Sequence, residues 1–201
     1  SLEDLCLASN FLSGGLPEDL FHLSKLERLT LQDNKFSGNL NANIGNLSSL
    51  VYLDVSLNEF SGNLPDVFLR FGKLNYFAAQ SNKFIGRIPM SLANSPTVAT
   101  LSLRNNSLGD TLDLNCAAMT SLVSLDLGTN QFRGAIPDNL PTCPQLRTIN
   151  LAKNSFTGQI PETFKNFQTL SYLSISNSSI YNLSSALATL QHCKNLTTLF
   201  L

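Results

Sequence analysis

Charged residues are scarce in this 201-residue chain, at 13% of the total, about half the share usual in soluble domains. The 13 basic and 14 acidic side chains nearly cancel, so nothing attracts nucleic acid or an anionic membrane electrostatically. No apolar run approaches the roughly 20 residues of a membrane helix. With four cysteines, two histidines and no CxxC pair, the usual zinc ligand patterns are missing. We expect no metal or cofactor, and we expect His22 and His192 to lie at the surface.

A repeat with a period of 24 residues organises the chain. An apolar residue opens each unit, and the next start comes 26 residues after the eighth, so the eighth unit carries a two-residue insertion. These first positions are Leu2, Leu26, Leu50, Leu74, Val98, Leu122, Leu146, Leu170 and Leu196. Solenoid folds carry this kind of fixed period.

Asparagine recurs in the same register, at the ninth position of the unit. The seven positions are Asn10, Asn34, Asn58, Asn82, Asn106, Asn130 and Asn154, and the eighth unit has Ser178 instead. An apolar residue, a glycine and a Leu-Pro or Ile-Pro pair follow in most units. The consensus is LxxLxLxxNxLxGxIPxxLxxLxx. Seven asparagines in one register exclude coincidental leucine spacing in an ordinary globular fold.

Each consensus position has a physical reason. The apolar residues at positions 4 and 6 alternate as in a short strand with one buried face, and such strands stack in parallel about 4.8 Å apart. The Asn amide both donates and accepts, so it can satisfy buried backbone groups in the turn. Glycine permits positive φ at the following bend. One unit cannot bury its own apolar face, so neighbours must stack into an α/β solenoid.

The LxGxIP half resembles the plant-specific leucine-rich repeat of receptor-kinase ectodomains and polygalacturonase-inhibiting proteins. Segments of the second half resemble the phytosulfokine receptors, which are plant receptor kinases that bind a tyrosine-sulfated pentapeptide. These segments are LSLRNNSL at 101–108, NCAAM at 115–119, PETFKNF at 161–167, SNSS at 176–179 and SSAL at 184–187. The resemblance implies a plant-type leucine-rich-repeat superhelix with 24-residue repeats and a parallel β-sheet on its concave face.

The resemblance also implies the setting of the chain. Residues 1–201 are expected to be a solenoid fragment, with eight repeats and the start of a ninth. Caps, a ligand-clamping island domain, a transmembrane helix and a serine/threonine kinase would lie outside it. The fragment itself would be non-enzymatic and would lie on the extracellular side of the plasma membrane, in a single-pass protein. Its partners would be a sulfated peptide hormone and, through regions outside the fragment, a co-receptor kinase ectodomain.

Positions 3, 5, 7 and 8 of each unit point onto the concave sheet, because alternate side chains face opposite ways. The later repeats present hydroxyls and amides there around a single guanidinium, Arg104. The resemblance assigns ligand contacts to Arg104, Asn150, Ser174 and Ser176, with Arg104 pairing with sulfate, since its fork suits oxyanions. Arg104 and Ser174 are three strand spacings apart, about 14 Å. The alternative is an ordinary solvated surface.

Three cysteines occupy positions where other repeats have Leu, Ile or Phe. Cys116, Cys143 and Cys193 are therefore expected in the core as free thiols, and Cys6 takes an outward strand position. Cys143 and Cys193 lie two repeats apart, about 10 Å, which exceeds disulfide reach. We expect no disulfide, and the adjacent-repeat pair Cys116–Cys143 is the one exception to check.

Glycosylation is predicted at five Asn-x-Ser/Thr sequons. They are Asn46, Asn105, Asn177, Asn182 and Asn195. Asn105 and Asn177 fall near the concave face, where a glycan would block a ligand, so they are the two candidates to stay unmodified.

Two other functions remain to be weighed. A secreted inhibitor of a cell-wall enzyme, of the polygalacturonase-inhibiting type, would use the same repeat but carry a charged or aromatic concave patch for a large protein surface. An enzyme is the weakest reading, because the concave positions offer no nucleophile–base pair, histidine cluster or glycine-rich phosphate loop.

Overall fold

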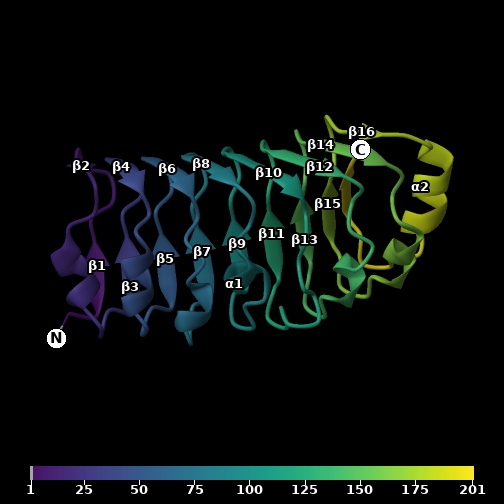
Figure 1. Ribbon diagram of the computed structural model, residues 1–201. Helices are drawn as coiled ribbons and strands as arrows, with labels where there is room; N and C mark the ends of the chain where they lie inside the picture. Colours follow the sequence, from purple (N-terminus) through teal and green to yellow (C-terminus); the bar gives the residue numbers. More distant parts are fainter. Residues whose placement is uncertain (1) are drawn as a thin grey trace.

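A computed structural model describes residues 2–201, which form two parallel sheets whose strands follow one another in sequence order (Figure 1). The first sheet lines the concave side and consists of β1 (Asp4–Cys6), β3 (Arg28–Thr30), β5 (Tyr52–Asp54), β7 (Tyr76–Ala78), β9 (Thr100–Ser102), β11 (Ser124–Asp126), β13 (Thr148–Asn150), β15 (Tyr172–Ser174) and β17 (Thr198–Phe200). The predicted plant-type solenoid with a parallel concave sheet is confirmed.

The sequence did not lead us to expect a second sheet. It consists of β2 (Ser13–Gly14), β4 (Lys35–Asn39), β6 (Glu59–Asn63), β8 (Lys83–Gly86), β10 (Ser107–Thr111), β12 (Gln131–Gly134), β14 (Ser155–Gly158) and β16 (Ser179–Ile180). In the concave sheet Leu29 pairs with Leu53, one full period later. In the second sheet Gly38 pairs with Phe60 instead, two residues short of a period. Its strands are therefore staggered, which a strict 24-residue pattern does not reveal.

Short helices close most repeats on the side opposite the concave sheet. Five are 3₁₀ helices and two are α-helices: η1 (Glu18–His22), η2 (Ala42–Asn46), η3 (Phe68–Arg70), α1 (Met90–Ala93), η4 (Leu140–Thr142), η5 (Glu162–Asn166) and α2 (Leu183–Leu190). The longest of these is α2, with eight residues, and it stands in the eighth repeat, where the two-residue insertion provides the extra length (Figure 1). The N-cap of α2 is Asn182, whose Oδ1 accepts the Ser185 N–H at 3.1 Å.

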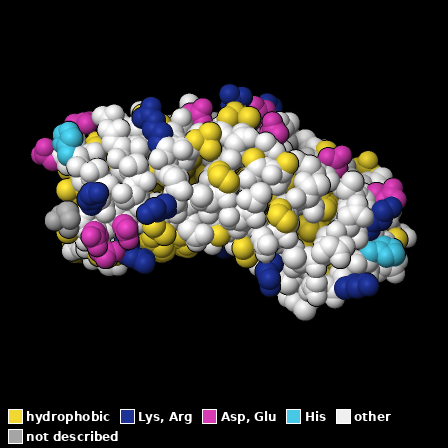
Figure 2. All heavy atoms as spheres, turned by 90° about the horizontal axis from the view of Figure 1, so that it is seen from below, with side chains coloured by type: hydrophobic (Ala, Val, Ile, Leu, Met, Phe, Trp, Pro, Cys, Tyr) yellow, Lys and Arg dark blue, Asp and Glu magenta, His cyan; other side chains and the backbone are white. Residues whose placement is uncertain are grey.

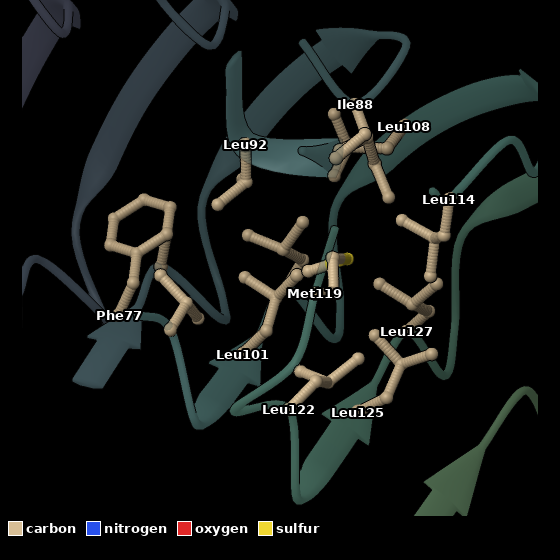
Figure 3. Close-up of a cluster of buried hydrophobic side chains, with 14 of the residues drawn as sticks. Phe77, Ile88, Leu92, Leu101, Leu108, Leu114, Met119, Leu122, Leu125 and Leu127 are labelled. Carbon is tan, nitrogen blue, oxygen red and sulfur yellow. The ribbon is translucent and has the colours of Figure 1, made fainter. Parts of the chain in front are cut away.

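A single apolar core runs between the two sheets and the helical side. Around Met119, side chains from the concave strands, such as Leu101 and Leu125, meet Leu108 of β10 and Leu92 of α1 (Figure 3). Phenylalanines of consecutive repeats stack along the axis, as Phe36–Phe60 at 6.1 Å, Phe60–Phe84 at 6.3 Å and Phe132–Phe156 at 6.4 Å between ring centroids. The apolar positions thus bury their faces against neighbouring repeats, as the solenoid principle requires.

The recurrent asparagines form a hydrogen-bonded ladder, as predicted. Asn58 Oδ1 accepts the Phe36 N–H at 3.0 Å, and its Nδ2 donates to the Leu31 carbonyl of the preceding repeat at 2.9 Å. The same Nδ2 also donates to the carbonyls of Val55 and Ser56 in its own turn. Each ladder side chain therefore satisfies backbone groups in two repeats. Asn34 and Asn58 are buried, whereas Asn82, Asn106, Asn130 and Asn154 are half-buried.

The ladder is incomplete at both of its ends. Among residues 2–201, the side chain of Asn10 bonds only to the carbonyls of Leu7 and Ala8 in its own repeat. In the eighth repeat the shorter Ser178 cannot span the gap between turns, and its Oγ is buried without a hydrogen-bond partner among residues 2–201.

The fifth repeat departs from the consensus without losing the backbone conformation. Asp110 adopts φ +74°, where six other repeats place a glycine with positive φ. Asp tolerates the left-handed region better than most residues because its short side chain bonds locally, and Asp110 Oδ1 accepts the Thr111 N–H at 3.0 Å. The consensus glycine is thus replaced by another residue type suited to the same bend.

The structure contradicts our expectation that all four cysteines are free. Cys116 and Cys143 form a disulfide, with Cα atoms 4.4 Å apart. The physical reason is that adjacent repeats stack at one strand spacing, which lies within disulfide reach. Cys193 is free and buried, with its Sγ 3.2 Å from the Phe164 carbonyl oxygen, and Cys6 is free and exposed. Burial raises the pKa of the Cys193 thiol.

Candidate functional site

The molecule is an arc with one hollowed side (Figure 2). Position 3 of successive concave strands forms a column along that side, because Arg28, Tyr52 and Tyr76 are register partners. The next three members, Thr100, Ser124 and Thr148, are smaller. The concave face therefore has an aromatic and charged part near the N-terminal end and a small, polar part further along.

The N-terminal part is a continuous stack of interacting side chains. The Arg28 guanidinium lies 3.4 Å from the Asp4 carboxylate and 4.5 Å from the centre of the Tyr52 ring. The rings of Tyr52 and Tyr76 are parallel, with centroids 4.2 Å apart. Burial, the largest cause, raises the pKa of the Tyr76 hydroxyl to about 12, so this tyrosine is neutral at physiological pH. The four side chains, with Glu27, border a hollow of about 190 Å³.

A second concave hollow, of about 250 Å³, lies between the fifth and ninth repeats. It is lined by Arg104, Gly128, Thr129, Asn150, Ala152, Lys153, Tyr172, Ser174, Ser176 and Phe200. All four residues that the sequence nominated as ligand contacts line this one hollow, although they come from the fifth, seventh and eighth repeats. We call it the concave hollow.

The concave hollow is lined by two cations, the Arg104 guanidinium and the Lys153 ammonium. Lys153 lies at the eighth position of its repeat with φ +56°, a left-handed turn that recurs in every repeat up to Asn177. Arg104 and Lys153 are both exposed. We find no ion-pair partner within 4 Å for either among residues 2–201, and both therefore remain available to an anion.

A half-buried carboxylate accompanies these cations. Asp126 Oδ1 accepts the Asn150 Nδ2–H at 2.8 Å and the Gly128 N–H at 3.1 Å. Burial raises the pKa of the Asp126 carboxyl above its usual 3.8, while the bonds from Gly128 and Asn150 and the charge of Arg104 act in the opposite direction. Sequence reasoning identified Asp126 only as an outward-facing residue; the structure adds that it is the register partner of Asn150 and accepts a hydrogen bond from it.

The two serines and an aromatic pair complete the concave hollow. Ser174 is buried and is the register partner of Asn150, while Ser176 is half-buried. The ring centroids of Tyr172 and Phe200 lie 5.9 Å apart, and the ring planes are tilted by 54°. The two rings give the hollow an apolar wall. We had not assigned a role to either aromatic residue.

All five predicted glycosylation sites are exposed. Asn105 and Asn177 adopt left-handed turns at the position next to Arg104 and Ser176, respectively. Asn105 Nδ2 donates to Ser81 Oγ at 3.1 Å. Glycans on these two side chains would stand at the edge of the concave hollow.

A larger hollow, of about 930 Å³, lies elsewhere, on the second sheet around Gly109. Its lining includes Ile85, Gly109 and Arg133. Its one ion pair, Arg133–Asp110 at 3.6 Å, joins two exposed side chains and has little binding value. None of the four residues that the sequence nominated as ligand contacts lines this larger hollow, whereas all four line the concave hollow, which we therefore take as the candidate site.

Comparison with known proteins agrees with this architecture. The sequence pattern of the family described as Leucine Rich Repeat matches residues 1–23, 25–47, 49–71, 121–143 and 145–167, more than half of the chain. The fold is thus a leucine-rich-repeat solenoid, and the chain belongs to the leucine-rich repeat family. Within residues 2–201 no helix is long and apolar enough to cross a membrane.

Several of the proteins that the chain resembles are plant receptors. Over 37 residues, 18% of this chain and 4% of the relative, it is 73% identical to phytosulfokine receptor 1 of Arabidopsis thaliana. The crystal structure of a TDR receptor superposes with a TM-score of 0.92, at 28% identity, over 100% of this chain and 34% of that chain. The ectodomain of the Arabidopsis receptor kinase HAESA, in complex with a peptide hormone, superposes with a TM-score of 0.84 at 28% identity. The match covers 96% of this chain and 33% of that chain. The chain thus spans about a third of these two receptor chains.

Proposed function

We propose that this chain is part of the extracellular domain of a plant receptor kinase and that the concave hollow binds a tyrosine-sulfated peptide, phytosulfokine in particular. The observation that carries the proposal is the convergence of Arg104, Asn150, Ser174 and Ser176 on one hollow. The short match to phytosulfokine receptor 1 supports the same ligand.

The chemistry of the concave hollow suits an extended peptide with an anionic group. The Arg104 fork can bind two oxygens of a sulfate ester, and that ester stays ionised at every physiological pH. Hydroxyls of Ser174 and Ser176 can bond peptide groups further along. An extended pentapeptide covers roughly 16 Å, which is close to the three strand spacings between Arg104 and Ser174.

Calorimetric titration of the complete extracellular domain with sulfated and unsulfated pentapeptide tests the proposal. Arg104→Ala should weaken binding of the sulfated peptide about 10- to 150-fold, as loss of a charge-assisted bond predicts. Arg104→Lys should retain only part of the affinity that Arg104→Ala loses, since lysine lacks the bidentate guanidinium group. Arg70→Ala, on η3 and away from the concave sheet, is the control and should bind normally. Equal weakening of both peptides, or of neither, would show that Arg104 does not recognise sulfate.

A second candidate function is favoured by one observation. A wall-enzyme inhibitor needs a charged or aromatic concave patch, and Arg28, Tyr52 and Tyr76 form one. Tyrosine and arginine are enriched at the centres of protein interfaces. If the chain is an inhibitor, it should lower polygalacturonase activity, and Tyr52→Ala with Tyr76→Ala should abolish the effect. Undiminished polygalacturonase activity at saturating protein eliminates this candidate.

A further inference from the structure

Asn150 is held in one orientation by its neighbours. Its Oδ1 accepts the Ala152 N–H at 3.1 Å, and its Nδ2 donates to Asp126 Oδ1 at 2.8 Å. The reverse orientation would set Nδ2 against a backbone donor and Oδ1 against a carboxylate, and both contacts would be repulsive. With these two bonds made, Asn150 retains one N–H for a ligand, and one of the two lone pairs of its Oδ1 is already used.

Gly128 provides the space that this arrangement needs. A Cβ at position 128 would lie 2.8 Å from Asn150 Nδ2 and 3.2 Å from its Cγ. The glycine does not have positive φ, so its backbone conformation does not require it. Other repeats carry Gln32, Ser56 or Gln80 at this position, and the absence of a side chain is specific to the repeat that faces Asn150.

We infer that Asp126 and Gly128 are positioning residues that fix Asn150 as a hydrogen-bond donor in the concave hollow. At that point the hollow presents a fixed N–H to a ligand acceptor, such as a peptide carbonyl or an anionic oxygen. The inference rests on the proposed function for the identity of the ligand. It extends that function by specifying which ligand group lies against Asn150 and what holds the amide.

A positioning role and a purely electrostatic role of the Asp126 carboxylate predict opposite changes in ligand affinity when Asp126 is replaced by alanine. If the carboxylate acts only by charge, its removal beside Arg104 should tighten binding of any anionic ligand, whatever residue replaces it. If it positions Asn150, Asp126→Ala should weaken binding. Asp126→Asn removes the charge but keeps an oxygen that can accept both bonds, so it should bind at least as tightly as the unmodified protein.

The experiment is calorimetry on the complete extracellular domain with sulfated and unsulfated pentapeptide. Asp126→Ala and Gly128→Ala should each lower the affinity for both peptides about threefold to tenfold, as expected for one misplaced hydrogen bond. Gly72→Ala is the matched control, because a Cβ there meets no atom within 4 Å, and it should bind normally. If Asp126→Ala binds as tightly as Asp126→Asn, or Gly128→Ala as tightly as Gly72→Ala, the positioning role is wrong.

A ligand-free measurement separates this inference from the proposed function. In ¹⁵N-resolved NMR spectra, the two Asn150 side-chain amide protons should be widely separated in the free protein, because one bonds to a carboxylate. Asp126→Ala should collapse the separation, and Gly72→Ala should not. If the separation collapses as expected but Arg104→Ala leaves sulfate discrimination intact, the proposed role of Arg104 is wrong and the positioning stands. An unchanged separation in Asp126→Ala overturns the positioning itself.

Discussion

Asn130 and Leu108 are joined across two repeats: Asn130 Oδ1 accepts the Leu108 backbone N–H at 3.0 Å. The Nδ2 of the same Asn130 side chain donates to the Leu103 carbonyl at 2.9 Å and to the Leu127 carbonyl at 3.1 Å. One amide thus connects the concave sheet and the second sheet of adjacent repeats. The stability of the stack depends on this bond pattern as well as on the apolar core.

Asn130→Ala should lower the free energy of unfolding by about 1–3 kcal/mol, because it leaves backbone groups of two repeats without partners. Thermal melts of the two proteins measure the effect. Asn10→Ala is the control, since the Asn10 side chain donates to carbonyls of its own repeat. This variant should lower the free energy of unfolding clearly less. Equal losses in both variants would mean that the cross-repeat bonds contribute nothing.

Ser178→Asn should stabilise the protein by about 0.5–1.5 kcal/mol, the usual contribution of a hydrogen bond. The turn before it has the same left-handed residue as the other repeats, at Asn177, and β16 pairs with β14 at the usual offset. An asparagine side chain should therefore reach the preceding repeat and replace a buried, unpartnered hydroxyl. A lower melting temperature in this variant would show that the eighth repeat cannot accommodate the ladder.

Two thiols, from Cys6 and Cys193, should react with an alkylating reagent in non-reducing denaturant. Mass spectrometry should recover a crosslinked peptide pair containing Cys116 and Cys143. Replacing both bridged cysteines by alanine should cost about 2–4 kcal/mol, since the unfolded chain regains the freedom of a closed loop. Four reactive thiols in the untreated protein would contradict the bridge.

Asp126→Asn should stabilise the protein near neutral pH and not in acid. The pKa of Asp126 is raised in the folded state, so folding favours its protonated form. The stability this gives is complete below the ordinary pKa of 3.8 and is lost as pH rises through the folded value. Urea unfolding at about pH 7 and about pH 3 should show a larger free energy of unfolding for the variant than for the unmodified protein only at the higher pH. An equal gain at both would assign the effect to something other than ionisation.

Lys153→Ala should weaken binding of the sulfated pentapeptide a few-fold at low salt and have little effect at high salt, because exposed charges are screened. The reason is that Asp126 offsets part of the Arg104 charge, so Lys153 leaves the concave hollow net positive. Lys25→Ala, at the N-terminal end of the chain, is the control. A loss that persists at 1 M salt would point to a direct bond instead.

The sequence alone determined the repeat, the parallel concave sheet and the asparagine ladder. Each follows from local physics: strand alternation, an amide that satisfies turn backbone, and faces that only a neighbouring unit can bury. The same register placed Arg104, Asn150, Ser174 and Ser176 on one face, because position within a repeat fixes which way a side chain points.

Only the tertiary structure decided how neighbouring repeats meet. The stagger of the second sheet, the Cys116–Cys143 bond and the contact of Asp126 with Asn150 all depend on distances across repeats. A periodic sequence gives the same description of every repeat, so it cannot show that a missing side chain at Gly128 makes room for the amide of Asn150. Those cross-repeat contacts set the shape and charge of the concave hollow.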